Sequence, residues 1–257
     1  MLNFRNVNIA FAIIFGTLLL FGRTYNLHWS IYVLIILIFL AIQTYGCYSI
    51  GSGFHIKTYC QKNTNEKEVA ITFDDGPDKI LTPGILNILR EFSIPAAFFC
   101  IGKKIAGNEN VLQQMHEDGH IIGNHSYSHD IWFDLFSTQR MTKELSETEN
   151  KIHEVIGSKP KFFRPPYGVT NPNLRRAVTN LKYDAIGWSI RSFDTVLKDE
   201  NKIFENVINK IEPGSVIVLH DTIPGTEIML RKLLSWLDKN KYKVSRLDEM
   251  FNLKAYE

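Results

Sequence analysis

Two adjacent carboxylates, Asp74 and Asp75, stand where an apolar segment of the chain meets Gly76-Pro77. Successive side chains of a β-strand point to opposite faces, so both acids can serve one site only where the strand ends and the chain turns. The Gly-Pro pair provides such a turn. Two carboxylates at one turn are suited to proton transfer or metal binding. The alternative is a helix N-cap carboxylate with its neighbour in solvent.

A second cluster is the segment HSYSH, in which His125 and His129 stand four positions apart. If this segment forms a helical turn, both imidazoles face the same side and can bind one metal ion. One added carboxylate gives three protein ligands with open positions, the arrangement of a catalytic rather than a structural metal site. An incidental pair is the alternative. Five further histidines lack such spacing and are interpreted as ordinary: His28, His55, His116, His120 and His153.

A third cluster, RPPYG, opens with Arg164 at the end of another short apolar segment. Its two prolines stiffen the turn and remove backbone donors. Arg164 can form a bidentate pair with a carboxylate and hold it ionised. The alternative is a rigid turn between a strand and a helix that carries a surface arginine.

Two further clusters lie late in the chain. Trp188 ends an apolar segment and Asp194 follows six residues later, although a core tryptophan is the default interpretation of that aromatic. His220 ends SVIVLH, the most apolar strand candidate in the sequence. An imidazole at the end of a buried parallel strand sits where barrel active sites are built.

These clusters need a scaffold that brings the ends of several strands together. From Val69 onward, short apolar segments alternate with longer amphipathic ones, which indicates β-α units, a parallel sheet and helices outside it. The strand candidates are Val69–Asp74, Ala96–Ile101, His120–Asn124, Lys161–Arg164, Tyr183–Ser189, Ser215–His220 and Lys243–Arg246. The helix candidates are Thr82–Phe92, Asn108–Asp118, Thr138–Ile156, Asn171–Asn180, Glu200–Ile211 and Thr226–Asn240. Seven strands without a glycine-rich nucleotide loop favour a barrel, and all five clusters fall at the carboxyl ends of expected strands.

The segments TFDDGP, HSYSH, RPPYG, WSIRSFD and VLHD resemble the five ordered motifs of the polysaccharide deacetylase family (the NodB-homology domain, carbohydrate esterase family 4). The resemblance covers roughly Glu68 to Leu247. It implies an α/β fold, a distorted (β/α)7 barrel. It also implies hydrolysis of acetyl groups from sugars, usually N-acetylglucosamine units of a cell-wall or extracellular polysaccharide.

The resemblance further implies a role for individual residues. The metal ligands would be Asp75, His125 and His129, and the divalent metal is expected to be zinc. The catalytic residues would be Asp74 as general base, Arg164 to orient it, His220 as general acid and Asp194 to tune that acid.

Substrate contacts follow from the same resemblance. The expected contacts are the backbone amide of Tyr167 as an oxyanion donor, Pro166, and Trp188 and Leu219 as walls of the pocket for the acetyl methyl group. One departure stands at Thr195, where many family members carry tryptophan. That difference bears on the shape of the substrate groove and not on the metal chemistry.

Residues 1–50 are a separate unit, expected to be a transmembrane hairpin with spans at about 7–22 and 29–50. A bilayer core needs about 20 apolar residues in a helix; the second stretch meets this length and the first is at its short edge. The alternative for the first stretch is a signal peptide, which the lack of a small-residue cleavage site disfavours. Residues 51–67 turn polar and are expected to be a linker to the domain 68–257.

The charges that flank the two stretches, Arg5, Arg23 and Lys57, are too sparse for the positive-inside rule to set the orientation. Acetylated glycan polymers lie outside the cytoplasmic membrane, so the catalytic domain is expected to face outward from the cell (inner) membrane. The expected partners are therefore the lipid bilayer and an acetylated glycan polymer. With 29 basic and 27 acidic residues, the chain shows no clustered basic surface of the kind that nucleic acid requires.

Three other functions stay open at this stage. The first is a metal-dependent amidohydrolase that acts on a small non-sugar amide. The second is a non-catalytic, membrane-anchored glycan-binding protein, which would need none of the acid, base and metal-binding residues. The third is an O-deacetylase, which shares the mechanism. The sequence carries no signature of the oligomeric state.

Overall fold

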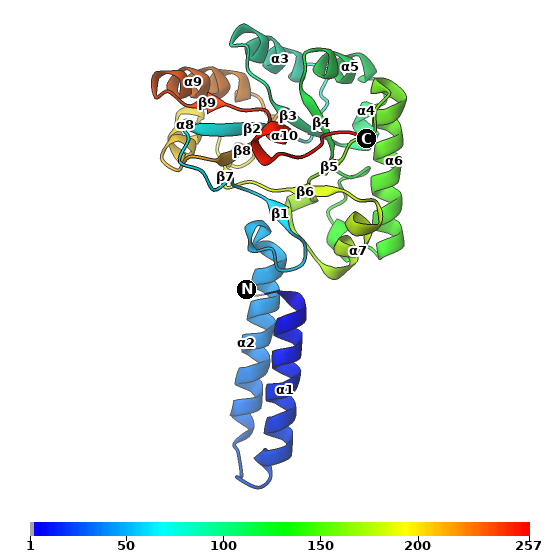
Figure 1. Cartoon of the computed structure of the whole chain (residues 1–257), viewed down its shortest axis with the longest axis vertical. Helices are drawn as coiled ribbons and strands as arrows, with labels where there is room; N and C mark the ends of the chain where they lie inside the picture. Colours follow the sequence, from blue (N-terminus) through cyan, green and yellow to red (C-terminus); the bar gives the residue numbers. More distant parts are fainter. Residues whose placement is uncertain (1–2) are drawn as a thin grey trace.

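The computed structural model describes residues 3–257, which form a pair of long N-terminal helices and an α/β domain standing on the end of that pair (Figure 1). The helices are α1 (Phe4–Gly22) and α2 (Trp29–Tyr48). Both are long and apolar enough to cross a membrane, and at most 6% of the apolar window in either is buried. These are therefore not core helices of the α/β domain. The expected pair of helices is confirmed, with bounds shifted by a few residues.

The two helices pack as an antiparallel hairpin. The rings of Phe11 and Phe39 stack with their centroids 4.0 Å apart. The Tyr32 hydroxyl donates to the carbonyl oxygen of Leu18 at 2.9 Å. These contacts join the two helices in both halves of their length.

The strands of the domain form one nine-stranded sheet within the described residues. They are β1 (Thr58–Tyr59), β2 (Glu68–Asp74), β3 (Ala97–Cys100), β4 (Ile121–Asn124), β5 (Phe162–Phe163), β6 (Asp184–Ile186), β7 (Ile190–Arg191), β8 (Ser215–His220) and β9 (Lys243–Val244). Their order is β1-β6-β5-β4-β3-β2-β8-β7, with β9 also paired to β2. Every one of these pairs is parallel. The expected distorted (β/α)7 barrel is confirmed as a curved parallel sheet.

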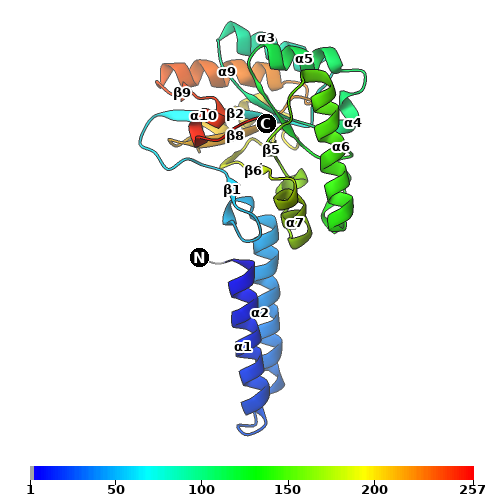
Figure 2. The same ribbon diagram turned by 45° about the vertical axis from the view of Figure 1, so that its right-hand side comes forward.

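Helices surround this sheet; most of them cover its outside, and the last one packs against the core inside its curve. They are α3 (Thr82–Glu91), α4 (Gly102–Ile105), α5 (Glu109–Glu117), α6 (Thr138–Ile156), α7 (Pro172–Asn180), α8 (Glu200–Ile208), α9 (Thr226–Lys239) and α10 (Leu247–Phe251). The part of the chain that the structure describes also contains three 3-10 turns: η1 (Ile50–Ser52), η2 (Phe133–Leu135) and η3 (Pro166–Gly168). Figure 2 shows α3, α5 and α9 along one side of the sheet and α6 along its edge.

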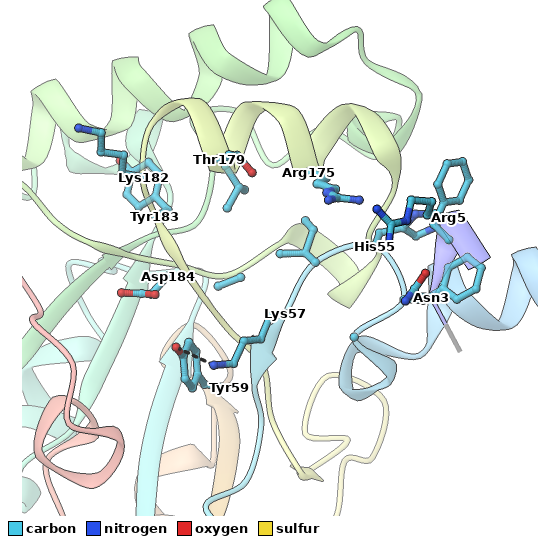
Figure 3. A pocket seen from close by; sticks show the side chains of 16 residues that line it. Asn3, Arg5, His55, Lys57, Tyr59, Arg175, Thr179, Lys182, Tyr183 and Asp184 are labelled. Carbon is cyan, nitrogen blue, oxygen red and sulfur yellow. Dashed lines mark hydrogen bonds between the residues drawn. The ribbon is translucent and has the colours of Figure 1, made fainter. Parts of the chain in front are cut away.

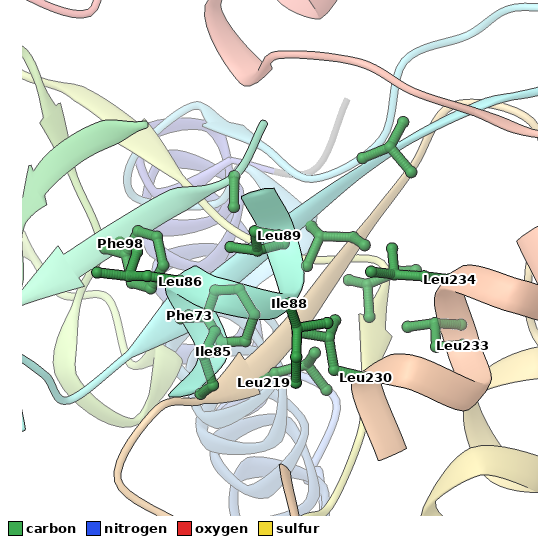
Figure 4. Close-up of a cluster of buried hydrophobic side chains, with 14 of the residues drawn as sticks. Phe73, Ile85, Leu86, Ile88, Leu89, Phe98, Leu219, Leu230, Leu233 and Leu234 are labelled. Carbon is green, nitrogen blue, oxygen red and sulfur yellow. The ribbon is translucent and has the colours of Figure 1, made fainter. Parts of the chain in front are cut away.

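The alternation of side chains along β2 and β8 separates two cores. Ile71, Phe73 and Leu219 point outward and pack with apolar residues of α3 and α9, as Figure 4 shows for Phe73 and Leu219. Ala70 and Val216 point inward and belong to a second, smaller core inside the curve of the sheet. Side chains along a strand alternate between the two faces with a period of two residues. The inward-facing positions that follow along β2 and β8 therefore lead to the functional side chains at the ends of these strands.

The segment expected to be a linker is partly built into the barrel. β1 pairs with β6, and just after it Gln61 forms an isolated bridge with Ser215 at the start of β8. The Lys62 amide donates to the carbonyl oxygen of Gly214 at 2.9 Å. The segment from β1 to Lys62 therefore joins the two ends of the sheet. β1 and β7 were not expected. Each is only two residues long, as are β5 and β9, but β1 lies in the polar segment and β7 comes directly after the strand candidate that contains β6, so no separate apolar segment marks either of them.

The helix pair is docked against the domain. The Thr170 amide donates to the carbonyl oxygen of Cys47 near the end of α2 at 2.9 Å, and the Phe4 amide donates to that of Phe54 at 3.0 Å. The Phe54 ring lies against Gly46, where a Cβ atom would come within 2.2 Å of the ring. Only a glycine fits at this contact between α2 and the segment that follows it.

Candidate active site

The carboxyl ends of β2, β4 and β8, together with η3, surround a cavity of about 200 Å³. Its lining includes seven residues that the sequence singles out: Asp74, Asp75, His125, His129, Tyr167, Trp188 and His220. The parallel pairing of β2 with β8 places Asp74 directly beside His220. Side chains that are up to 146 positions apart in the sequence thus meet at one rim of the sheet, as expected for a barrel of this kind.

Asp74 and Asp75 face the same cavity because the strand turns between them. Asp74 is the last residue of β2, and Asp75 has a φ of 75°, in the left-handed region that few non-glycine residues adopt. Gly76 follows, and a Cβ atom there would lie 2.1 Å from a carboxylate oxygen of Asp221. The turn that the sequence predicted is present, and it is packed so tightly that no side chain fits at Gly76.

Asp75, His125 and His129 form a group that fits a metal ion. Their ligand atoms all lie within 4.8 Å of one another. The Asp75 Oδ1 atom is 3.5 Å from His125 Nε2 and 3.4 Å from His129 Nε2. This buried oxygen has no hydrogen-bond partner among the described residues. One carboxylate and two imidazoles are donors that suit a catalytic zinc site.

The protonation of the two imidazoles also suits a metal ion. The Nδ1 atom of His125 lies 2.8 Å from the carbonyl oxygen of Arg164; a carbonyl can only accept, so Nδ1 carries a hydrogen, and in the neutral ring the lone pair is then on Nε2, which faces Asp75. Burial and the neighbouring His125 lower the pKa of His129 to about 4. His129 is therefore neutral at neutral pH, the form that binds metal.

The histidine pair lies on a loop and not on the helical turn that the spacing predicted. Ser126 and His129 have φ angles of 64° and 48°, and no helix is assigned between β4 and η2. The side chain of Glu144, on α6, holds this loop. Its Oε2 atom accepts from the amides of Tyr127 and Ser128 at 3.1 and 2.7 Å. The four-residue spacing therefore brings the imidazoles together through a loop that is fixed from outside.

Sequence reasoning missed Glu144, although a signal for it exists. Glu144 lies on the buried face of α6 with Met141, Leu145 and Thr148. A carboxylate on the apolar face of an amphipathic helix needs a partner, and here the partners are the loop amides. Such a position marks a candidate support for a neighbouring site.

Arg164 is fully buried and contacts Asp74, but not in the bidentate manner expected. Its NH1 atom donates to Asp74 Oδ1 and to the Thr72 hydroxyl, each at 2.7 Å. NH2 and Nε donate instead to the carbonyl oxygens of Gly187 and Ile186. The guanidinium is thus shared between one carboxylate oxygen and two backbone carbonyls, which fixes the orientation of Asp74. The alternative of a surface arginine is wrong.

His220 and Asp194 form a two-point contact. The Nδ1 atom of His220 lies 2.7 Å from Asp194 Oδ1, and the His220 amide donates to Asp194 Oδ2 at 2.7 Å. Burial opposes the charged imidazolium, but the hydrogen bond to Asp194 and the charges of Asp194, Asp74 and Asp75 outweigh it. Together they raise the pKa of His220 to about 9. At neutral pH His220 is protonated, as a general acid must be.

Two expected substrate contacts are wrong by one position. Leu219 is fully buried in the outer core, and its neighbour Val218 lines the cavity. His220 faces inward, so the period of two in a strand turns Val218 inward and Leu219 outward. Pro165, and not Pro166, also lines the cavity.

Tyr167 lies where its backbone amide is suited to binding an oxyanion. It stands in the first turn of η3, where backbone N–H groups have no partner within the helix. Its φ of 58° is left-handed, and its ring lies 4.7 Å from that of His129. The amide and the metal-binding group are therefore on the same wall of the cavity.

The remaining wall carries Trp188, Thr195 and Arg191. Trp188 packs so close to Gly168 that a Cβ atom there would lie 2.6 Å from the indole. Thr195 and Arg191 are exposed; neither had a predicted role as a wall of the pocket. At Thr195, the departure from the tryptophan of many family members, a short side chain leaves this edge of the cavity open to solvent.

Comparison with known proteins agrees with this geometry. Residues 61–186 match the family model described as polysaccharide deacetylase. The chain is 33% identical over 191 residues to a peptidoglycan-N-acetylglucosamine deacetylase of Bacillus cereus, across 73% of this chain and 69% of the relative. It is 31% identical over 189 residues to the peptidoglycan-N-acetylmuramic acid deacetylase PdaC of Bacillus subtilis, across 72% of this chain and 40% of the relative.

A solved structure shows the same fold. The crystal structure of the Bc1960 peptidoglycan N-acetylglucosamine deacetylase superposes with a TM-score of 0.74 and 31% sequence identity, covering 77% of this chain and 94% of that one. Sequence motifs, cavity and fold thus agree. The chain belongs to the polysaccharide deacetylase family, carbohydrate esterase family 4, and is a carbohydrate N-deacetylase.

Proposed function

We propose that this protein removes acetyl groups from N-acetylglucosamine units of cell-wall peptidoglycan, with a divalent metal ion, zinc in the first place, as its cofactor. The observation that carries the proposal is the cavity in which a metal-binding group, a buried carboxylate and a protonated histidine meet. The similarity to peptidoglycan deacetylases supports the choice of polymer.

Asp75, His125 and His129 hold the metal ion in this proposal. When bound, the ion supplies Lewis-acid polarisation of the acetyl carbonyl and lowers the pKa of water. Asp74 lies beside these ligands, with its Oδ2 atom 3.9 Å from His125 Nε2. The chain therefore fixes the reacting groups before the substrate arrives.

The proton transfers fall to two residues. Asp74, oriented by Arg164, accepts the proton of the water that adds to the acetyl carbonyl carbon. His220, protonated through Asp194, then donates a proton to the amine nitrogen as the C–N bond breaks. The products are acetate and a free amino sugar. The Tyr167 amide stabilises the oxyanion of the intermediate, a contact that is typically worth about 3–4 kcal/mol.

Replacing Asp194 by asparagine is expected to shift the pH dependence of the reaction. The active form of His220 is the protonated one, so activity is lost as pH rises through its pKa of about 9. Without the Asp194 charge, burial remains and the pKa falls toward the ordinary value of about 6.5. The alkaline limb of kcat/KM therefore moves down by up to about two and a half pH units, a loss of up to roughly 30-fold at pH 8. An unchanged alkaline limb between pH 6 and 10 would show that Asp194 does not control the general acid.

The substrate is tested by acetate release from a panel of glycans. The panel contains peptidoglycan, poly-N-acetylglucosamine, chito-oligosaccharides, an O-acetylated glycan and a small N-acetylated amide without a sugar, each with and without chelator. We expect acetate to be released from peptidoglycan, and we expect the chelator to abolish this release. Release from the small amide alone would favour the small-amide amidohydrolase, and release from the O-acetylated glycan alone an O-deacetylase. No release at all would leave the glycan-binding protein.

We also propose that α1 and α2 anchor the protein in the cell (inner) membrane with the catalytic domain facing outward. The two helices have the length and composition of membrane spans, and the expected polymer lies outside the cytoplasm. On spheroplasts, external protease should then degrade the domain after Tyr48. A domain that stays intact until the membrane is permeabilised would contradict this orientation.

A further inference from the structure

A second cavity, larger than the active site, lies where the helix pair meets the domain. Its volume is about 770 Å³, and Figure 3 shows its lining side chains. The lining comes from the start of α1, the segment after η1, and α7 with the start of β6. We call it the juxtamembrane cavity. It shares no lining residue with the catalytic cavity.

The charge of this cavity is strongly positive. Its cationic lining residues are Arg5, Lys57, Arg175 and Lys182, and its single acidic one is Asp184. Within residues 3–257, none of these four cations has a carboxylate oxygen within 4.0 Å. Four cations gathered in a hollow with a single acidic residue repel one another, and an anion bound between them relieves that repulsion.

A buried histidine adds a polar group to the same cavity. His55 lines it and is 5% exposed, and its Nδ1 atom has no hydrogen-bond partner among the described residues. Its other nitrogen, Nε2, lies 3.4 Å from the Cys47 sulfur. Figure 3 shows the His55 ring together with the side chains of Arg5 and Arg175 at one end of the cavity. The Nδ1 atom itself has almost no accessible surface, so His55 adds polarity to this end of the cavity, while the two exposed arginines are the groups that a ligand can reach.

The position of the cavity indicates which anion it meets. Arg5 belongs to the first turn of α1, and Gly53 to Lys57 follow closely after the end of α2 at Tyr48. With the helix pair across a bilayer, as in the proposed function on which this step rests, the cavity lies at the level of the lipid headgroups on the side of the domain. Arginine binds phosphate with its planar, forked donors, and juxtamembrane basic groups attract anionic lipids.

We propose that the juxtamembrane cavity binds the phosphate of an anionic phospholipid headgroup, with Arg5 and Arg175 as its charged contacts. This assigns a lipid site to the protein apart from its catalytic cavity. The bound lipid would link α1, the segment after α2 and α7, and so fix the domain on its anchor.

The chain offers a matched pair of variants for the test. Arg175 and Arg176 are neighbours on α7 and both are exposed, so neither replacement disturbs the core. Arg175 lines the cavity, whereas Arg176 contacts Thr138 and Asn173 on the domain surface. Each variant thus removes one positive charge from the same helix. Arg175→Gln removes it from the cavity, and Arg176→Gln removes it from outside the cavity. A second variant in the cavity, Arg5→Gln, approaches it from α1.

The full-length protein is released from mixed micelles that contain equal amounts of phosphatidylglycerol and phosphatidylcholine, and its retained lipids are counted by native mass spectrometry. We expect phosphatidylglycerol to be retained selectively. Arg175→Gln and Arg5→Gln should each lower its occupancy at least about fivefold, and Arg176→Gln should leave it unchanged. Equal retention of both lipids, or equal losses in Arg175→Gln and Arg176→Gln, would overturn the proposal. Displacement of the lipid by inorganic phosphate at the same concentration would also overturn it, because the ligand would then be the free anion.

Two controls separate this proposal from the proposed function. Extraction of membranes at alkaline pH without detergent tests the anchor. If this treatment released the wild-type chain from the membrane, both the anchor and the lipid site would be overturned. Acetate release tests the chemistry, and the two cavity variants should keep it. A wild-type chain that stays in the membrane and deacetylates normally, but retains both lipids equally, would overturn the lipid site alone.

Discussion

Replacing Asp74 by asparagine should lower acetate release by about 10²–10⁴-fold while the metal ion stays bound. Asparagine has nearly the shape of aspartate, so the cavity and its three metal ligands are kept. It cannot take up the proton of the attacking water, however, and the reaction loses its base. Acetate release and metal content, measured on the same preparation, check this expectation.

The variant has a matched control in Asp238→Asn, which removes one negative charge from the exposed surface of α9. This control should keep full activity. Asp74→Asn will also weaken the contact with the buried guanidinium of Arg164, which was 2.7 Å from the carboxylate. A thermal unfolding curve therefore accompanies the assay, so that a loss of folded protein is not mistaken for a loss of the base. A folded variant with wild-type turnover would remove Asp74 from that role.

Asp75→Ala and His129→Ala should instead lose the metal and the activity together. Each removes one of three ligands whose donor atoms lie within 4.8 Å of one another, and two protein ligands are fewer than catalytic zinc sites use. We expect a fall in activity of at least about 10³-fold, since the polarisation of the carbonyl is lost with the ion. Chelation of the wild-type protein should have the same effect, and added Zn²⁺ should restore the wild type but neither variant.

His153→Ala is the control for these variants, because His153 is an exposed histidine on α6 outside the cavity. It should bind metal and release acetate as the wild type does. If Asp75→Ala kept a full complement of metal, or stayed active after chelation, the metal-binding group would have to be sought elsewhere. The comparison with Asp74→Asn is the most informative result. Both variants should be inactive, but Asp74→Asn should still bind the metal ion and Asp75→Ala should not.

The sequence allowed the site to be located because its chemistry lies at strand ends. An apolar segment followed by a polar residue marks the carboxyl end of a parallel strand, and such ends meet at one rim. This argument brought Asp74 and His220 together across 146 positions. Helices of nine or more residues, such as α3 and α6, show a clear helical spacing of apolar residues in the sequence. They were predicted within a few residues of their bounds.

The errors have two physical causes. β1 and β7 are two-residue strands held by their neighbours, and their pairing depends on distant chain segments rather than on a local pattern. The loop of His125 and His129 is likewise shaped from outside, by Glu144. The choice of Leu219 over Val218 had a different origin. Strand parity already places residue 218 on the face of His220, so the inference from the family resemblance was wrong by one residue where the residue pattern alone would have given the correct side.

The docking of the helix pair has a consequence for where the enzyme can work. The hydrogen bond between Thr170 and the carbonyl oxygen of Cys47 joins the end of α2 to the chain just after η3, the same turn that carries Tyr167. With the hairpin in a bilayer, the catalytic mouth stands at a set height and has no flexible tether that would let it swing outward. Its reach is then a thin shell next to the membrane. Under the proposed anchoring and substrate, we expect glycan strands to be modified as they pass through that shell and layers farther out to lie beyond the reach of the enzyme.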